Sequence, residues 1–309
     1  MFSIIIPAFK TKYLFYAIKS VLDQTFEDFE LIIVNDKSPE NVAEIVAKFE
    51  DKRISYYENE NNLGSKSVVS SWNNCLKYAK FEYTLLFSDD DILEPDFLLE
   101  INELIKQYPL VDLFYSRVAV IDQDNKIIRY TCSAPEREVV LDFIWHRLRG
   151  LREIYAPNFV FRTKSLIEIG GFVDFPLAWG SDDATWFSLA KTNGVVSTNK
   201  VLCNWRWSEL NISKIGNVKL RLNAIETFLT WVANFVNSHD SRNAFETELK
   251  QEIFVALPLY KDMLKKSLIQ RLFENNTKLD AVMLFLKYKG QYKLPYSTFL
   301  KSIMVKKTR

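Results

Sequence analysis

Three consecutive aspartates, Asp89, Asp90 and Asp91, are the residues of this chain whose types and spacing could most directly do chemistry. They follow residues 83–87, a short apolar run rich in β-formers that predicts a buried strand. They come just before Pro95, which suits the first turn of a helix. Because ligands bind at the carboxyl edge of open α/β sheets, we expect these carboxylates to lie at a ligand-binding edge.

Like charges packed together are unfavourable unless a cation offsets them. Carboxylate oxygens suit Mg²⁺ or Mn²⁺, ions that usually keep several waters and share the phosphates of a substrate. The acid cluster therefore predicts a site for one of these cations. A solvated acidic turn or a helix cap is the alternative that a bare run of three aspartates leaves open.

The composition limits the other chemistries that the chain could perform. Of its 309 residues 48% are hydrophobic and 26% are charged, which is typical of a soluble protein with a sizeable core. Its two histidines, His146 and His239, leave little material for a histidine-based zinc site or a Ser-His-Asp triad. We therefore expect carboxylates to carry the chemistry.

The cysteines and the N-terminus favour a cytosolic protein. Cys75, Cys132 and Cys203 are odd in number and widely spaced, which indicates reduced thiols. The chain enters a strand-like pattern by Ser3 with no basic segment or cleavage site before it, so we expect no export. No apolar run approaches the roughly 18 residues of a membrane span.

Predicted strands and helices alternate through the first two thirds of the chain, which favours an α/β fold with a doubly wound, mostly parallel sheet. The predicted strands are 2–7, 30–34, 54–57, 83–87, 111–116, 118–122, 126–130, 158–162, 195–197 and 201–205. The predicted helices are 14–22, 42–49, 65–80, 97–107, 139–149, 163–169 and 182–191, followed by an almost wholly helical region with helices at 220–237, 244–260, 261–273, 279–288 and 298–305.

The opening of the chain resembles the family 2 glycosyltransferases, which are inverting enzymes with the GT-A fold. The resemblance rests on SIIIPAF at residues 3–9, SVLDQTF at 20–26 and ELIIVNDKS at 30–38, followed in order by an N-x-G turn, the acid cluster and a late acidic pair. It covers about residues 2–215. It implies a GT-A domain over 1–215, with a nucleotide-binding half at about 1–95 and an acceptor half at about 96–215. Residues 216–309 would form a helical C-terminal region.

The resemblance also implies a binding site for a nucleotide-sugar donor. Asp36 would accept a hydrogen bond from the base, uracil being favoured, although a plain turn aspartate is the alternative. Lys66 would be a phosphate partner, although an exposed helix lysine is equally compatible with the sequence. The residues that match the family's donor-binding positions are Pro7, Ala8, Phe9, Asp36, Asn62, Gly64, Lys66 and Asp89.

For catalysis, the resemblance implies that Asp90 is the firmest metal ligand, with Asp89 and Asp91 beside it. Asp183, with Asp182 before it, would be the general base, which takes a proton from the acceptor hydroxyl as that oxygen attacks the anomeric carbon. The cation, Mn²⁺ or Mg²⁺, would stabilise the departing diphosphate. A helix N-cap with a first-turn acid is an alternative interpretation of Asp182 and Asp183, and the two roles are compatible.

Several positions depart from the family pattern. Asn35 stands in place of Asp, Lys37 in place of Gly and Trp72 in place of Arg. Ser88 stands in place of Asp and Asp182 in place of Glu. The late segment Trp205-Arg206-Trp207-Ser208 lacks the His of the family pattern. A nucleotide-sugar-binding protein without activity is therefore the alternative function. A nucleotidyltransferase is a third class, but residues 7–11 lack the glycine-rich phosphate loop that it requires.

The C-terminal region is strongly basic. Residues 255–309 hold 12 Lys or Arg and three acidic residues, a net charge of +9. Its lysines and aromatic residues could seat the protein on anionic lipid, where it would meet a lipid-linked acceptor. A helical cap or an oligomer surface is the alternative, and without a recognition motif we expect no nucleic-acid partner. The residues concerned are Lys265, Lys266, Lys287, Lys289, Lys293, Lys301, Lys306 and Lys307, with Phe285, Tyr288, Tyr292, Tyr296 and Phe299.

Overall fold

The computed structural model describes residues 1–207 and 218–304, in which strands and helices alternate. The strands are β1 (Phe2–Ala8), β2 (Phe29–Asn35), β3 (Ile54–Glu58), β4 (Tyr83–Leu86), β5 (Ile92–Leu93), β6 (Leu113–Ile121), β7 (Ile127–Tyr130), β8 (Arg137–Glu138), β9 (Phe159–Arg162) and β10 (Val195–Arg206). The helices are α1 (Leu14–Leu22), α2 (Val42–Val46), α3 (Val68–Cys75), α4 (Phe97–Gln107), α5 (Val140–Leu148), α6 (Thr163–Glu168), α7 (Ser181–Ala190), α8 (Val218–Ser238), α9 (Ala244–Asn275), α10 (Lys278–Tyr292) and α11 (Tyr296–Met304), with 3₁₀ turns at Leu76–Tyr78, Ala156–Asn158 and Pro176–Ala178.

The described strands form one mostly parallel sheet in the order β3-β2-β1-β4-β9-β6-β10-β5, with β7 beside β6 and β8 beside β10. Strands β1 to β4 run parallel, and β10 runs parallel to β6. Strand β9 is antiparallel to both β4 and β6, so these two point the same way. The near-continuous apolar runs of β1 and β2 are buried, as expected of central parallel strands covered on both faces.

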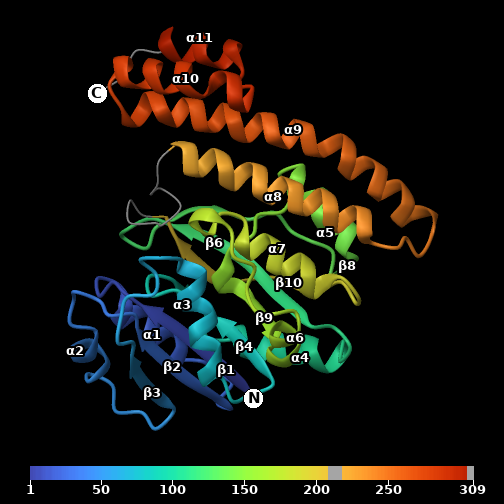
Figure 1. The fold of residues 1–309 in the computed structure, drawn as a ribbon. Coiled ribbons are helices and arrows are strands. Elements are labelled where there is room, and N and C mark those ends of the chain that lie inside the picture. The colour runs from blue at the N-terminus through green and yellow to red at the C-terminus, as the bar shows by residue number, and fades with distance from the viewer. Residues whose placement is uncertain (208–217, 305–309) are drawn as a thin grey trace.

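Helices cover both faces of the sheet, which confirms the predicted α/β architecture (Figure 1). On one face α1, α2 and α4 pack through residues such as Leu14, Val42 and Phe97. On the other face α3, α5, α6 and α7 pack through residues that include Val69 and Phe187. Helices α1 and α4 each bury one apolar side, whereas α7 is buried nearly all round.

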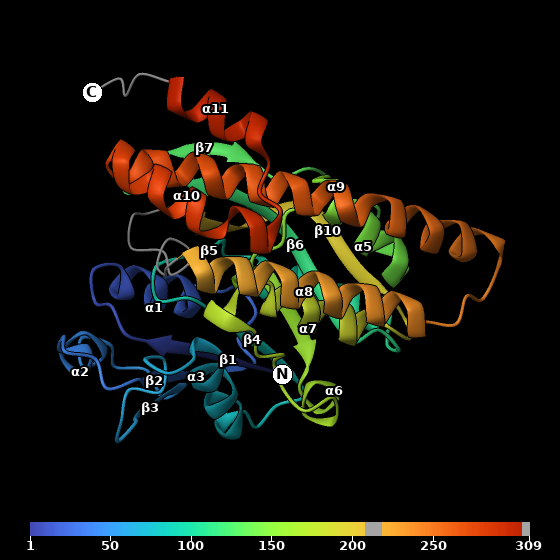
Figure 2. The same cartoon turned by 45° about the horizontal axis from the view of Figure 1, so that its top comes forward.

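The C-terminal helices divide between two cores. Helix α8 and the first half of α9 join the core on the second face of the sheet, where Phe228 and Ile253 are fully buried. The second half of α9 packs with α10, α11 and the start of α8 around a smaller core that includes Phe285. Figure 2 shows α8 and α9 lying side by side along the sheet domain, with α10 and α11 at one end of α9.

The structure differs from the predicted elements at several points, which include the two short strands β5 and β8 that were not predicted. The two helices predicted at 244–260 and 261–273 are one helix, α9, with Pro258 inside it. Pro258 is exposed, and it removes one backbone hydrogen bond of the helix. The strand pairs predicted at 111–122 and 195–205 are the continuous strands β6 and β10. The predicted boundary at residues 215–216 lies outside the described residues.

Two further expectations concern the cysteines and a membrane span. Cys75, Cys132 and Cys203 are all unpaired. Among the described helices, none combines the length and the apolar character needed to cross a bilayer.

Candidate active site

The carboxyl edge of the sheet gathers most of the predicted site residues. Because β1, β2 and β4 are parallel, Phe9, Asp36 and Asp89 follow their ends at one edge. Helix α7 leads directly into the start of β10 and therefore runs back against the strand direction. Its first turn, which holds Asp182 and Asp183, consequently lies toward the same edge.

Asp89 ties the turn after β4 to the loop after β1. Its Oδ2 accepts hydrogen bonds from the backbone N–H of Phe9 at 2.9 Å and of Lys10 at 2.8 Å. Burial raises the pKa of Asp89 to about 6, and the charge of Asp90 adds to the shift while the two N–H groups oppose it. Asp89 therefore fixes the loop that contains Phe9, next to the place where the resemblance puts the nucleotide base.

Asp91 and Arg206 join the acid cluster to the end of β10. Asp91 Oδ1 accepts the backbone N–H of Arg206 at 2.7 Å, and the buried Arg206 guanidinium donates to the carbonyl oxygens of Asp90 at 2.7 Å and Asp122 at 2.9 Å. Asp91 is 1% exposed, and its Oδ2 has no hydrogen-bond partner. Burial, followed by the charge of Asp90, raises the pKa of Asp91 well above the ordinary value.

Asp90 is the partly exposed member of the cluster, and burial raises its pKa while Lys10 and Arg206 oppose the shift. Among the described residues, the carboxylate oxygens of Asp89, Asp90 and Asp91 do not all come within 4.8 Å of one another. The orphaned oxygen of Asp91 and the oxygen-only donor set nevertheless fit Mg²⁺ or Mn²⁺. These ions are usually held by one or two carboxylates together with substrate phosphates.

Asp36 fixes the turn that contains Asn62 and Gly64. Its Oδ1 accepts hydrogen bonds from Asn59 Nδ2 at 2.7 Å and Leu63 N at 2.9 Å, and its Oδ2 accepts from Gly64 N at 2.7 Å. Asn62 Oδ1 accepts the N–H of Ser65, which tightens the turn further. A carboxylate has about four lone-pair sites, so Asp36 keeps capacity for one more donor.

Gly64 is required by its close approach to Asp36. A Cβ added at Gly64 would lie 2.9 Å from Asp36 Oδ2. We expect Gly64→Ala to push the turn away from Asp36 and to weaken nucleoside diphosphate binding about tenfold, the equivalent of one hydrogen bond to a charged group. Calorimetric titration measures this change, and Gly290→Ala is the matched control because nothing lies within 4 Å of its added Cβ. Equal affinity of wild type and Gly64→Ala would remove the turn from the donor site.

The other predicted donor-site residues lie in or near this edge. Pro7 and Ala8 end β1, and Lys66 is exposed in the turn before α3. Lys37, which stands in place of the family glycine, has a positive φ of 54°. The backbone at Lys37 thus has the left-handed conformation that glycine adopts most easily.

Asp183 is held by an arginine that the sequence did not point to. Arg147 on α5 donates from Nε to Asp183 Oδ1 and from Nη2 to Asp183 Oδ2, both at 2.9 Å. Asp183 is 3% exposed. A bidentate pair of this kind fixes the orientation of the carboxylate as well as its charge.

Asp182 is the more accessible carboxylate of the pair, and its Oδ1 accepts the backbone N–H of Asp183 at 3.0 Å. Burial raises the pKa of Asp182 to about 7, and the negative charge of Asp183 adds to the shift. A carboxylate with a pKa near neutrality can take up a proton during a reaction and release it afterwards.

Sequence reasoning missed Arg147, Arg206 and the role of Asn73. Asn73 on α3 accepts the N–H of Phe172 at 2.8 Å and donates to the Phe172 carbonyl oxygen. It therefore holds the loop formed by residues 170–172, Gly-Gly-Phe, which precedes α7. A Cβ on Gly171 would lie 2.5 Å from Asn73, which explains the glycine. For Arg206 and Asn73 the available signal was their place in or beside segments compared with the family pattern, whereas nothing in the sequence marked Arg147.

A second acidic group lies apart from this edge. Glu138, Asp142 and His146 bring ligand atoms within 4.8 Å of one another. Glu138 already forms a bidentate pair with Arg152, at 3.0 and 2.8 Å. These contacts account for the group as an ion-pair network around the start of α5.

Comparisons with known proteins show which chains are similar to this one. An uncharacterized glycosyltransferase of Rickettsia felis is 30% identical over 222 residues, which are 70% of this chain and 36% of that protein. The chain thus spans about a third of the length of that relative. A glucosyltransferase of Escherichia coli, WfgD, is 25% identical over 215 residues, 68% of this chain and 79% of the relative. Its name states that it transfers glucose from UDP-Glc to GlcNAc-diphosphoundecaprenol.

Solved structures share the fold. Staphylococcus aureus TarS 1–349 in complex with UDP-GlcNAc has a TM-score of 0.64 at 16% identity, over 98% of this chain and 90% of TarS. A mannosyltransferase of Pyrobaculum calidifontis, in complex with GDP-Man and Mn²⁺, has a TM-score of 0.58 at 14% identity, over 98% and 84%. The predicted GT-A fold is confirmed. The family model described as glycosyl transferase family 2 matches residues 3–170, which is more than half of the chain, and the chain therefore belongs to glycosyltransferase family 2.

Proposed function

We propose that the protein is an inverting glycosyltransferase that moves a sugar from a nucleoside diphosphate sugar, with UDP favoured, to a hydroxyl group of a glycan or lipid-linked glycan. The observation that carries the proposal is the position of the acid cluster and of the Asp182–Asp183 pair toward one edge of the sheet. A transferase of this kind needs a diphosphate-binding region and a base on either side of the reacting sugar.

The donor would bind in the half formed by residues 1–95. Asp36, whose carboxylate already orders the turn at Gly64, would accept a hydrogen bond from the base beside Pro7, Ala8 and Phe9. Lys66 is exposed close to that turn and would contact phosphate oxygens. The bound UDP-GlcNAc in the TarS complex and the UDP-Glc in the name of WfgD support a uridine nucleotide.

Asp90, with Asp89 and Asp91 beside it, would hold Mn²⁺ or Mg²⁺ together with the diphosphate, and the cation when bound would neutralise the charge that develops on the leaving group. The P. calidifontis mannosyltransferase, which binds Mn²⁺ together with GDP-Man, supports this assignment. Asp89 holds the loop after β1 by accepting the backbone N–H of Phe9. Arg206 holds the turn at Asp90 by donating to the Asp90 carbonyl oxygen.

The Asp182–Asp183 pair would be the general base, in which the resemblance singles out Asp183. It would take the proton of the acceptor hydroxyl while that oxygen attacks the anomeric carbon and the bond to the diphosphate breaks. Arg147 orients Asp183 through its bidentate contact, and burial together with the charge of Asp183 raises the pKa of Asp182 to about 7. We propose that the proton is accepted by the pair as a unit.

The acceptor half would comprise about residues 96–215, followed by the helical region. The acceptor in the name of WfgD supports a lipid-linked glycan in the synthesis of a surface polysaccharide. A cytoplasmic protein in peripheral contact with the inner membrane surface, alone or as an oligomer, would meet such an acceptor.

Activity is tested by the release of nucleoside diphosphate from a panel of UDP-, GDP-, CDP- and dTDP-sugars, with and without Mn²⁺, in the presence of a glycan acceptor. We expect one donor to be turned over in the presence of metal, and the product linkage to have the opposite anomeric configuration to the donor. Metal-dependent binding of a diphosphate without any turnover would favour the alternative of an inactive nucleotide-sugar-binding protein.

A further inference from the structure

Helices α10 and α11 expose apolar side chains to solvent. Leu279, Met283 and Leu286 recur at helical spacing along one side of α10, and Tyr296 and Leu300 lie one turn apart on α11. These side chains are between 48% and 70% exposed. We call this set the basic apolar face, because exposed lysines accompany it.

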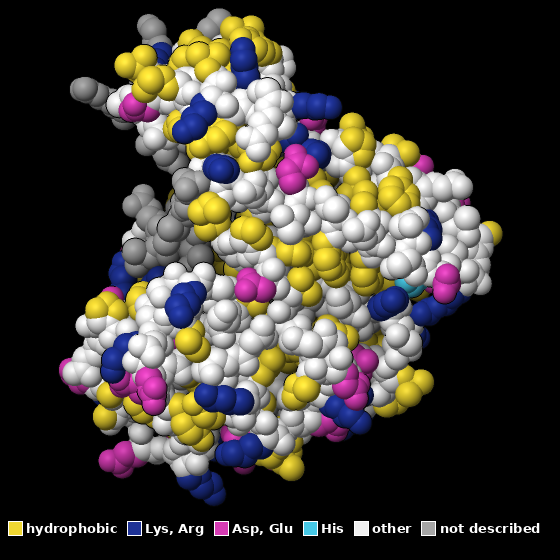
Figure 3. Space-filling model, viewed as in Figure 1, with side chains coloured by type: hydrophobic (Ala, Val, Ile, Leu, Met, Phe, Trp, Pro, Cys, Tyr) yellow, Lys and Arg dark blue, Asp and Glu magenta, His cyan; other side chains and the backbone are white. Residues whose placement is uncertain are grey.

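Exposed lysines lie beside the apolar stripe of α10. Lys287 follows Met283 by four residues, which places it on the same side of the helix, and Lys293 is the exposed residue at which α10 ends. Residues 278–304 contain five lysines and a single acid, Asp280. Figure 3 shows hydrophobic side chains in yellow, with dark blue Lys or Arg side chains among them, at the top of the molecule where these helices lie.

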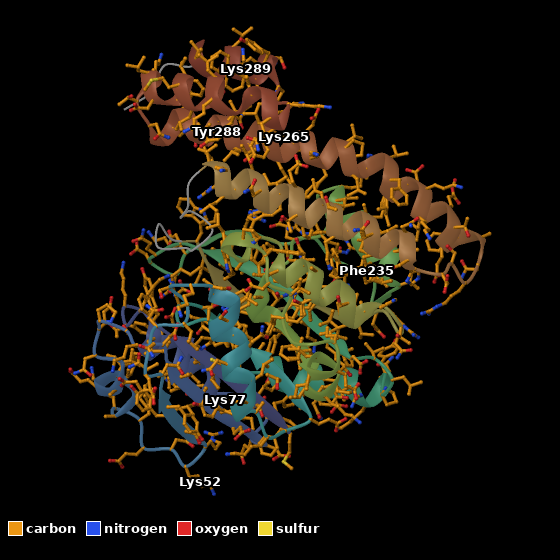
Figure 4. The ribbon with its side chains drawn as sticks, viewed as in Figure 1. Lys52, Lys77, Phe235, Lys265, Tyr288 and Lys289 are labelled. Carbon is orange, nitrogen blue, oxygen red and sulfur yellow. The ribbon has the colours of Figure 1, made fainter. Side chains whose placement is uncertain are left out.

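The face differs from the one that the sequence predicted. Lys265 is buried between helices, where it donates to the carbonyl oxygen of Tyr292 at 2.6 Å and faces Glu226 of α8 (Figure 4). Phe285 and Phe299 are not at the surface but stacked in the core of the C-terminal helices. Lys306 and Lys307 lie outside the described residues. Leucine and methionine, joined by Tyr296, therefore make up the exposed apolar surface of α10 and α11.

The fold holds this face near the candidate active site. Val218 and Leu222, in the first turns of α8, belong to the same core as α10 and α11. Tyr292 of α10 also donates from its hydroxyl to Asn223 Oδ1 at 2.6 Å. In Figure 2 the start of α8 and the strand β5, which directly follows the acid cluster, lie at the end of the molecule beneath α10 and α11.

We propose that the basic apolar face binds the surface of a bilayer that contains anionic phospholipid. Leu279, Met283 and Leu286 would enter the boundary between headgroups and acyl chains while Lys287 and Lys293 contact the anionic headgroups. The benefit of such binding rests on the proposed function, because it brings the site to a lipid-linked acceptor. A second copy of the chain fits this face less well, since a two-fold interface would bring the same lysines together.

Vesicle flotation of the full chain tests the proposal, with phosphatidylcholine vesicles that contain or lack phosphatidylglycerol. We expect wild-type protein to bind at least tenfold more strongly to the anionic vesicles, and about 1 M salt to release it because the screening length falls to about 3 Å. Lys287→Glu/Lys293→Glu should weaken binding at least 25-fold, at about fivefold per lysine removed from an anionic surface. Leu279→Glu/Met283→Glu should abolish it.

The matched control is Lys48→Glu/Lys52→Glu, which reverses two exposed lysines next to the β3 edge of the sheet and should keep wild-type binding. Equal binding by the control and the Lys287/Lys293 variant, equal binding to neutral vesicles, or no binding by the wild type would overturn the proposal. The proposal would also be overturned if sedimentation showed a wild-type dimer that Leu279→Glu/Met283→Glu dissociates while vesicle binding stays unchanged. The vesicle assay contains no nucleotide-sugar donor, so a loss of vesicle binding does not contradict the proposed transferase activity. A loss of transferase activity likewise does not contradict membrane binding by the basic apolar face.

Discussion

Asp182→Asn is expected to lower kcat about 10²- to 10⁴-fold while the free energy of unfolding stays nearly unchanged. Asparagine has the same shape and can still accept the backbone N–H of Asp183, but it cannot take a proton. Steady-state kinetics and thermal unfolding measure the two quantities. Glu44→Gln, which changes the first-turn acid of α2, is the matched control and should keep both at wild-type values.

Asp183→Asn is expected to lose activity to a similar extent and, in addition, about 3–5 kcal/mol of stability. Removing one partner of a buried ion pair leaves the charge of Arg147 uncompensated. The loss of stability in Asp183→Asn, but not in Asp182→Asn, distinguishes the two variants even if their kcat values are equal. Wild-type kcat in both variants would contradict the assignment of the base, and full activity in one of them alone would place the base on the other residue.

The pH dependence of kcat/KM follows from the same pair. Only a deprotonated base can accept a proton, and burial with the charge of Asp183 raises the pKa of Asp182 to about 7. The rate should therefore fall as the pH drops below about 7 and level off above it. In Asp183→Asn the residual kcat/KM should begin to fall only at a lower pH, because the neighbouring negative charge that raises the pKa of Asp182 is gone.

Asp90→Ala is expected to weaken Mn²⁺-dependent binding of the nucleoside diphosphate at least 100-fold, since changes to residues that only orient metal ligands already cost about 10- to 100-fold. The fold should remain intact, because the change removes one of three crowded negative charges. Calorimetry in the presence and absence of Mn²⁺ measures the effect. Asp124→Ala, at an exposed turn, is the control, and an unchanged Mn²⁺-dependent affinity in Asp90→Ala would contradict the metal assignment.

The sheet was predictable because the residues of a short segment are enough to specify each of its strands and the helices beside them. The apolar runs at β1 and β2 and the helical spacing of α1 and α4 specify elements within short segments, and the carboxyl-edge rule then places Asp36 and Asp89. The family motifs added the expected roles of Gly64 and of the Asp182–Asp183 pair. These positions follow from residue types at fixed offsets, which a sequence displays directly.

The contacts that complete the site were not predictable because they join distant parts of the chain. Arg147 and Asp183 are 36 residues apart, and Arg206 and Asp91 are 115 apart, so no periodicity connects them. The same holds in the C-terminal helices, where Phe285 turns inward because α9 and α11 cover it. An amphipathic helix reveals two faces in its sequence, but the partner helices decide which apolar residues remain outside.

Calorimetric titration of UDP, GDP, CDP and dTDP into wild-type protein, each with and without Mn²⁺, tests the central claim most directly. Metal-assisted binding of a nucleotide-sugar donor at the carboxyl edge predicts that one diphosphate, with UDP favoured, binds in the presence of Mn²⁺ and loses most of its affinity without it. Failure of all four to bind, or binding of equal strength with and without metal, would contradict the claim.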